Sequence, residues 1–231
     1  MRVFGISDLH LSLGGSDKPM DRYGSMWVRH WEKIEARWRE RVRPDDVVLV
    51  AGDHSWGLKM PQVLPDLEFI ARLPGTKVMG KGNHDMWWHG NGKLQKLGLP
   101  DVFWVQASTF SRGGLHVAGS RGWSLPGTEF CQTEEDQAVF ARELERMKRA
   151  LEMLPTDGWR MAMTHYPPLL SDLRDTPMSR LFQDFNIRQV VYGHLHVGHL
   201  ARAFQGTHAG VEYRMVSCDV NGFEPVEMVE V

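Results

Sequence analysis

The sequence predicts an α/β (α+β) domain built from two β-sheets. Short apolar runs typical of buried strands alternate with segments of helical periodicity along the first half, at 2–6, 25–42, 46–51, 63–73 and 77–79. Each of these strands ends in a loop that carries Asp, His or Asn. Of the 231 residues 42% are hydrophobic and no fixed-period repeat is present, so we expect one domain over residues 1–231.

The strand at 46–51 and the helix at 25–42 show the two patterns most clearly. Residues 47–50 are four successive apolar residues, which suits a strand covered on both faces. In the helix, three tryptophans and Ile34 recur at helical spacing, with Arg and Glu between them. We expect these large side chains to belong to the core.

A polar and aromatic insertion interrupts the alternation at about 86–100. Strands are predicted beyond it at 102–107 and 115–119, followed by a long helix at 133–153. Thr133 is the expected N-cap of that helix, because three acidic residues follow it where the helix dipole favours negative charge. The other charges of the helix are expected to form a solvated face.

The second half repeats the order of strand and polar loop. A strand at 159–163 runs into His165, and a strand at 188–192 runs into Gly193-His194-Leu195-His196. A short helix at 178–185 separates them, and strands at 213–217 and 226–231 complete the prediction.

Charge and cysteine content limit the classes of partner and compartment. The formal net charge of -2 disfavours a general nucleic-acid or anionic membrane surface. Cys131 and Cys218 lack metal-site spacing and are expected to be reduced thiols. The N-terminus does not resemble a signal peptide, and no apolar run approaches the ~20 residues of a membrane span, so we expect a cytoplasmic protein without a membrane partner.

The polar residues at the strand ends form a candidate metal site. Carboxylate, imidazole and amide donors together suit Mn, Fe or Zn, and the absence of Cys among them argues against a structural zinc site. The potential ligands are Asp8, His10, Asp53, Asn83, His165, His194 and His196. Seven ligands are too many for one ion, whereas two ions ~3.5–4 Å apart with a shared carboxylate would use them all. Asp53, alone after its strand, is the expected bridge.

Five blocks of this sequence resemble the calcineurin-like metallophosphoesterase superfamily. They are Asp8-Leu9-His10, Gly52-Asp53, Gly82-Asn83-His84-Asp85, His165 and Gly193-His194-Leu195-His196. The resemblance implies a four-layer αββα sandwich, two mixed β-sheets packed face to face with helices outside. It further implies a first metal held by Asp8, His10, Asp53 and His196, and a second held by Asp53, Asn83, His165 and His194.

The same resemblance implies a catalytic role for His84, which would face the substrate while Asp85 orients it. The implied reaction is hydrolysis of a phosphomonoester or phosphodiester by a hydroxide that bridges two divalent ions, with Mn²⁺ expected first and Fe, Zn or Ni as alternatives. A small phosphorylated substrate is the expected partner, and nothing indicates an oligomeric state.

Other readings remain open. A nucleotide-specific phosphodiesterase or nuclease is one alternative, and a catalytically silent metal-binding scaffold is another. UDP-diacylglucosamine hydrolase is disfavoured, since that group typically has Arg where His84 stands.

Several residues near the blocks have two readings each. Arg121 could bind a substrate phosphate or cap the core, and Tyr166 could touch substrate or pack beneath the metal loop. Trp87 and Trp88 could stack on a flat substrate group or pack within the insertion. His54, His89 and His199 could support the site, although a simple loop position is the preferred reading. The loops at 12–24 and 87–100 are expected to set specificity.

Overall fold

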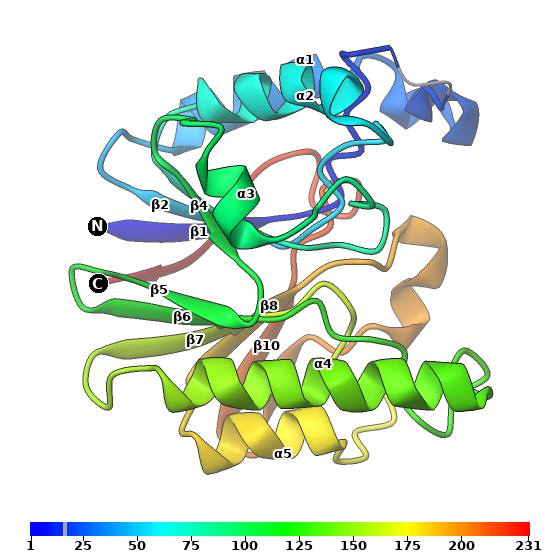
Figure 1. Ribbon diagram of the computed structural model, residues 1–231, viewed down its shortest axis with the longest axis vertical. Helices are drawn as coiled ribbons and strands as arrows, with labels where there is room; N and C mark the ends of the chain where they lie inside the picture. The colour runs from blue at the N-terminus through cyan, green and yellow to red at the C-terminus, as the bar shows by residue number, and fades with distance from the viewer. Residues whose placement is uncertain (16–17) are drawn as a thin grey trace.

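A computed structural model describes residues 1–15 and 18–231, and it arranges them as helices, sheet, sheet and helices (Figure 1). Helices α1 and α2 cover the outer face of one sheet, and α4 and α5 cover that of the other. The helices are η1 (Met20–Tyr23), η2 (Ser25–Trp27), α1 (His30–Arg41), α2 (Met60–Ala71), α3 (Asn91–Gln95), α4 (Glu134–Glu152), α5 (Pro177–Asp184) and η3 (Val197–Arg202). The predicted αββα sandwich is confirmed.

Both sheets are mixed, and their antiparallel strands lie at the edges. The strands are β1 (Arg2–Ile6), β2 (Val47–Val50), β3 (Thr76–Gly80), β4 (Val102–Val105), β5 (Ser108–Arg112), β6 (Leu115–Gly119), β7 (Trp159–Met163), β8 (Gln189–Tyr192), β9 (Gly206–His208), β10 (Val211–Met215) and β11 (Val226–Glu230). One sheet has the order β11-β1-β2-β3-β4, in which only β11 is antiparallel. The other has the order β5-β6-β7-β8-β10-β9, with antiparallel β5 and β9 outermost.

Three apolar clusters separate the four layers. Val47 and Leu49 of β2 face the second sheet, where Val117 and Val191 belong to the same cluster. Val48 and Val50 point the other way, into the cluster that contains Trp38 of α1. The third cluster joins the second sheet to α4 and α5. Strand β2 is therefore covered on both faces, as its unbroken apolar run predicts.

The predicted helix at 25–42 is two elements rather than one. Residues 25–27 form the 3₁₀ helix η2, Val28 is extended, and α1 begins after Arg29, whose φ of 51° is left-handed. The break lets Trp27 leave the helical line and pack edge-on against His10 and His196. Helical spacing therefore identified Trp27, Ile34 and Trp38 as buried, with Trp31 half-buried against the same cluster, but it did not show the turn after Trp27.

Other boundaries shift for local reasons. Helix α2 begins at Met60 instead of 63, with Pro61 in its first turn, where a missing N–H costs no helical hydrogen bond. Strands β5 and β9 and the short helix α3 were not predicted, because short edge strands carry weak apolar patterns. Residues 16–17 of the predicted loop at 12–24 lie outside the described residues.

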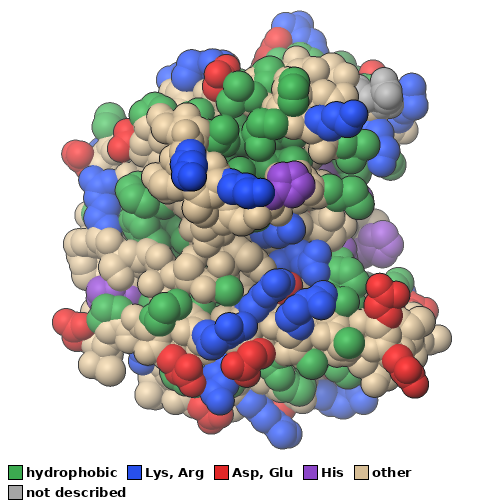
Figure 2. Space-filling model, viewed as in Figure 1, with side chains coloured by type: hydrophobic (Ala, Val, Ile, Leu, Met, Phe, Trp, Pro, Cys, Tyr) green, Lys and Arg blue, Asp and Glu red, His purple; other side chains and the backbone are tan. Residues whose placement is uncertain are grey.

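The surface charges of α4 are mixed in sign. Figure 2 shows Lys and Arg beside Asp and Glu along this helix, and Arg149 lies 3.8 Å from Glu145 one turn earlier. The Thr133 hydroxyl caps the helix by accepting from the backbone N–H of Asp136 at 3.0 Å. This arrangement confirms the expected N-cap and solvated face. Among the described residues, no helix has the length and apolar character that a bilayer crossing requires.

Candidate metal centre

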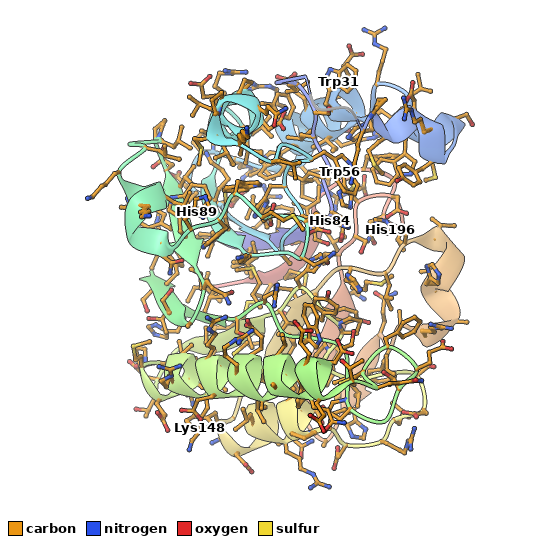
Figure 3. The ribbon with its side chains drawn as sticks, turned by 45° about the vertical axis from the view of Figure 1, so that its right-hand side comes forward. Trp31, Trp56, His84, His89, Lys148 and His196 are labelled. Atoms are coloured by element: carbon orange, nitrogen blue, oxygen red, sulfur yellow. The ribbon has the colours of Figure 1, made fainter. Side chains whose placement is uncertain are left out.

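The carboxyl ends of five parallel strands meet at one edge of the sandwich and carry the predicted ligands there. Asp8 and His10 follow β1, Asp53 follows β2, and Asn83 follows β3; the second sheet supplies His165 after β7 and His194 and His196 after β8. Figure 3 shows His84 and His196 facing this edge from the two halves of the molecule. The loops bond to one another directly: the amides of Asp8 and His10 donate to the carbonyls of Gly52 and Asp53, both at 3.0 Å.

Four of the predicted ligands hold a strained backbone. Asp8, His10, Asp53 and His194 have φ values of 57°, 44°, 54° and 71°, in the left-handed region that non-glycine residues rarely adopt. Such conformations cost on the order of 1–3 kcal/mol each and persist where the surroundings impose them. Their concentration at one edge marks this region as functional.

Two glycines allow the loops to approach each other. A Cβ on Gly82 would fall on the carboxylate and backbone nitrogen of Asp53, and a Cβ on Gly193 would fall on the side chains of Ser7 and Asp8. Neither glycine has a positive φ, so the requirement is space rather than conformational freedom.

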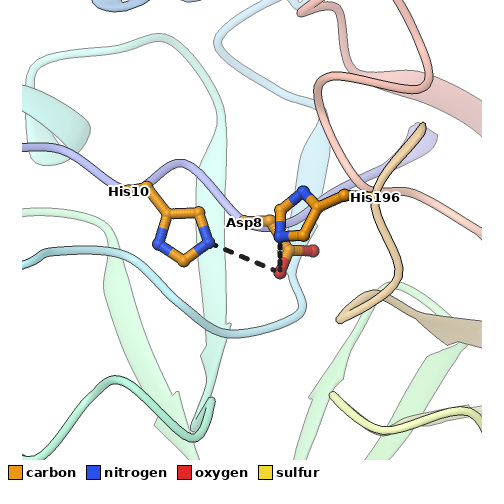
Figure 4. A group of neighbouring side chains, drawn as sticks. All are labelled: Asp8, His10 and His196. Carbon is orange, nitrogen blue, oxygen red and sulfur yellow. Dashed lines mark ion pairs between the residues drawn. The ribbon is translucent and has the colours of Figure 1, made fainter. Parts of the chain in front are cut away.

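Asp8, His10 and His196 form the first group of donors (Figure 4). Oδ1 of Asp8 lies 3.9 Å from Nε2 of His10 and 4.0 Å from Nε2 of His196. The other oxygen, Oδ2, accepts hydrogen bonds from the Ser7 and Ser217 hydroxyls and from the His194 amide. Oδ1 shares only the His194 amide, at the longer distance of 3.3 Å, so it is the oxygen presented to the site.

His165, His194 and Asn83 form the second group. Nε2 of His165 and Nδ1 of His194 are 3.2 Å apart, and Oδ1 of Asn83 lies 2.7 Å and 3.0 Å from them. Nδ1 of His165 is 2.9 Å from the Ala51 carbonyl, to which it donates. That hydrogen bond leaves Nε2 as the ring nitrogen directed into the site.

Asp53 lies between the two groups. Its Oδ2 is 3.7 Å from Nε2 of His10 and 3.4 Å from Nε2 of His165, while Oδ1 accepts from the His84 amide at 2.9 Å. The predicted bridging position of Asp53 matches this geometry.

The donor set fits divalent cations. Burial lowers the pKa of His10 and of His194 to about 3, so both rings are neutral and offer lone pairs. Burial acts in the same direction on His165, but the neighbouring Asp53 carboxylate outweighs it and raises the pKa to about 9. A cation is thus favoured where His165, Asp53 and Asn83 converge. Ligands at right angles around an ion, each ~2.1 Å from it, lie about 3 Å apart, close to the 2.7–3.2 Å spacing of the second group.

Comparison with known proteins agrees with this geometry. Residues 1–198 match the family described as calcineurin-like phosphoesterase. The chain belongs to the calcineurin-like phosphoesterase family. It is accordingly a metal-dependent phosphoesterase, as the five blocks predict.

Solved structures resemble this phosphoesterase in fold at low sequence identity. A phosphopantetheinyl hydrolase from Mycobacterium tuberculosis has a TM-score of 0.60 at 17% identity and covers 100% of this chain and 96% of its own. A protein of unknown function from Aquifex aeolicus has a TM-score of 0.52 at 16% identity, and the match covers 98% of this chain and 95% of that protein. A Thermus thermophilus protein has a TM-score of 0.56 at 14% identity, and the match covers 87% of this chain and 86% of that protein. No curated protein matches the chain.

His84 stands beside the metal centre of this phosphoesterase. Its ring centroid is 4.3 Å from that of Trp56 and 5.6 Å from that of His10. Burial lowers the pKa of His84, and the Asp53 carboxylate opposes that change. Trp56 also stacks on His10 at 4.6 Å, so one indole supports both a predicted ligand and the predicted catalytic imidazole.

The hydrogen bonds of Asp85 differ from those expected of a residue that holds the His84 ring directly. Its carboxylate is fully buried and accepts from the backbone amides of Gly82 and Asp53, at 2.7 Å and 2.9 Å, and of His54 at 3.0 Å. Within the described chain these bonds go to backbone, and none joins Asp85 to the His84 ring. Asp85 therefore ties the loop after β3 to the loop after β2, and it orients His84 only through that backbone.

The reading of His54 as a simple loop residue is wrong. His54 is fully buried, and its Nε2 lies 2.7 Å from the Gly80 carbonyl. Its Nε2 lies 3.7 Å from Oδ2 of Asp85, and its ring stacks against Trp88. His54 therefore packs beside the carboxylate that joins the two loops. His89 and His199 are exposed.

The remaining candidates divide between packing and the site. Trp87 and Trp88 are buried at 1% and 5% exposure, which confirms packing and excludes an aromatic pair at the rim. Arg121 lies 3.6 Å from the buried Glu143 and over the Trp123 ring at 4.6 Å. Tyr166 packs on His194 at 4.1 Å and also lines the cavity next to the metal centre. Substrate contact by either residue stays a prediction.

Two residues that contact the candidate site are not among those predicted from the sequence pattern. Asp219 accepts a hydrogen bond from His196 at 3.1 Å, and Trp56 contacts both His10 and His84. The sequence could have indicated Asp219, since this acidic residue follows the end of the predicted strand at 213–217 by two residues. Trp56 follows Asp53 by three residues but belongs to no polar pattern.

Proposed function

We propose that this phosphoesterase hydrolyses a phosphomonoester or phosphodiester with two divalent cations, one on each side of Asp53. The observation that carries the proposal is the position of that carboxylate, within 3.7 Å of an imidazole from each group of donors. The set holds seven donors, more than one divalent ion usually binds, so two ions account for the whole donor set.

When bound, the two cations would acidify a water molecule and screen the charge of the phosphoryl oxygens. The chain contributes positioning. His10, His165 and His194 supply fixed nitrogen donors, while Asp8 and Asp53 supply the anionic oxygens. A reacting phosphate held over Asp53 would lie next to His84, because both residues line the same cavity.

His84 is proposed to assist the leaving group. Its ring is held by Trp56 and its backbone by Asp53, so it has a fixed place at the cavity wall. A positioned imidazole there can donate a hydrogen bond to a phosphoryl oxygen or a proton to the departing oxygen.

Mn²⁺ is proposed as the working metal, since a mixture of carboxylate, amide and imidazole donors suits it. A cytoplasmic location is proposed as well. The free, buried thiols of Cys131 and Cys218 support a reducing compartment.

A two-substrate assay tests the proposal. The purified protein is loaded with Mn²⁺, its metal content is measured by elemental analysis, and p-nitrophenyl phosphate is compared with its bis-p-nitrophenyl diester. Metal-dependent hydrolysis of either supports the proposal, and the preferred ester assigns mono- or diesterase activity. Two bound metals with no hydrolysis of either ester would favour a silent scaffold and overturn it.

A further inference from the structure

A cavity of about 680 Å³ opens directly beside the metal centre. One side of it is formed by Asp53, His84, His194 and His196. The rest comes from the segment before α4, the loop after β7, and the end of the loop after β8 with helix η3. The lining residues there are Ser124, Leu125, Thr128, Glu129, Phe130, Tyr166, Pro167, Leu170, Leu195, His199 and Arg202. No described residue of the loops at 12–24 and 87–100 lines it, so the expectation that those loops set specificity is not supported by the cavity.

The wall away from the metal centre is largely apolar. Its side chains include Leu125, Phe130, Pro167, Leu170 and Leu195. Phe130 is 57% exposed, so it stands at the open rim, whereas Leu125 is buried. A cavity of this size and character is typical of a site for a small organic molecule.

The charged side chains of this wall neutralise each other. Nη2 of Arg202 lies 2.6 Å from Oε1 of Glu129, and the guanidinium also sits over the Phe130 ring at 4.8 Å. Arg202 is the only Lys or Arg among the described lining residues. Since its charge is already compensated, the wall offers no free Lys or Arg side chain to a second phosphate, and its other basic group is the imidazole of the exposed His199.

We infer that this cavity binds the organic group of the substrate, and that this group is neutral and mainly apolar. The inference rests on the proposed function, because the metal centre must hold the phosphate for the organic group to reach the wall. It distinguishes the substrate from nucleic acid and from nucleoside polyphosphates, whose additional phosphates need cationic partners.

A series of n-alkylphosphonates tests the inference without relying on turnover. Methyl-, butyl- and octylphosphonate present the same metal-binding head and differ only in apolar length. Binding to the Mn²⁺-loaded protein is measured by calorimetry. Kd should fall from methyl to butyl by up to about fourfold for each methylene buried. The bisphosphonate with the butyl chain should bind more weakly than butylphosphonate, because its second anion would enter the apolar wall.

Three variants locate the effect. Leu170→Trp fills the cavity and should weaken octylphosphonate at least about tenfold while sparing methylphosphonate, consistent with the loss of two or more buried methylenes. Phe130→Ala removes an exposed part of the wall, so it cannot disturb the core, and should weaken octylphosphonate severalfold. Phe103→Ala is the matched control, because Phe103 is also exposed, at 43%, but lies outside the cavity.

The failures of the two proposals are distinguishable. Equal Kd values for methyl- and butylphosphonate, or tighter binding of the bisphosphonate, would overturn the inference even if esters are hydrolysed. Chain-length dependence that disappears in Leu170→Trp supports the inference even if neither p-nitrophenyl ester is cleaved.

Discussion

The carboxylate of Asp219 accepts a hydrogen bond from His196, with 3.1 Å between Oδ1 and Nδ1. Asp219 is nearly buried, and its other oxygen accepts from the amide of Val197 at 3.1 Å. Burial would lower the pKa of His196, but the bond to Asp219 raises it. With Nδ1–H engaged, the lone pair of Nε2 faces Oδ1 of Asp8, so Asp219 fixes both the tautomer and the direction of a predicted ligand.

Asp219→Asn should weaken metal binding at the first site about 10–100-fold, the range found when a carboxylate that orients a ligating histidine is removed. Competition with a chelator of known affinity measures the change. Asp184→Asn, an exposed acid at the end of α5, is the control and should bind metal like the wild type. Equal affinity of both variants would show that His196 needs no carboxylate partner.

Asp53→Asn should reduce the retention of both metals. The reason is that Oδ2 of Asp53 approaches His10 and His165 together, so one substitution removes anionic charge from both groups of donors. Elemental analysis after gel filtration checks this prediction. Full occupancy of two metals per chain would contradict the bridging role, and loss of one metal alone would assign Asp53 to a single site.

His84→Ala should retain both metals and lose about 10²–10⁴-fold in kcat, the usual contribution of a positioned general acid. Measured metal content separates this result from a damaged metal centre. His89→Ala is the matched control, because His89 is an exposed histidine five residues along the same segment. A kcat within twofold of the wild type would remove His84 from the mechanism.

The gathering of the candidate ligands at one edge could be predicted because a simple topological rule places them there. Parallel strands end at a common edge, so polar residues directly after apolar runs must gather there. Asp8, Asp53 and His165 each obey that rule, and the structure brings them within metal-binding distance of one another. The rule needs no knowledge of loop conformation, so the sequence was enough to predict which residues gather at this edge.

The contacts that support the ligands could not be predicted in the same way. The roles of Asp85 and His54 depend on which backbone amides a buried side chain meets, and neither periodicity nor composition encodes that. The cavity wall was missed for a similar reason. Leu125, Leu170 and Leu195 come from three loops that share no sequence pattern, and only the tertiary arrangement places them around one space.

Gly82→Ala should destabilise the metal centre, since the new Cβ would overlap the Asp53 carboxylate. Overpacking of this kind costs about 1–3 kcal/mol, and we expect weaker metal retention together with a lower Tm. Gly92→Ala in α3 is the control, because its Cβ would have no heavy atom within 4 Å, and a helical alanine is favourable. Similar Tm and metal content in the two variants would refute the requirement for space at Gly82.

Asp66 of α2 should make stability depend on pH. It is fully buried and accepts from the Ser55 hydroxyl at 2.5 Å and from the Leu13 amide at 2.7 Å, joining two loops that flank the site. Burial raises its pKa from 3.8 to about 6 despite these bonds. The native state therefore binds a proton at Asp66 more tightly than the unfolded state between these values, and the contribution of Asp66 to stability falls as pH rises from about 4 to 6.

The comparison with Asp66→Asn isolates this effect, because Asn keeps the size and an acceptor oxygen but does not titrate. The difference in unfolding free energy, wild type minus variant, should fall by up to about 3 kcal/mol between pH 4 and pH 7, the equivalent of the change in pKa. Urea unfolding at several pH values measures it, with metal removed so that ligand protonation is the same in both proteins. A difference that stays constant with pH would show that Asp66 ionises at its ordinary pKa in the folded chain.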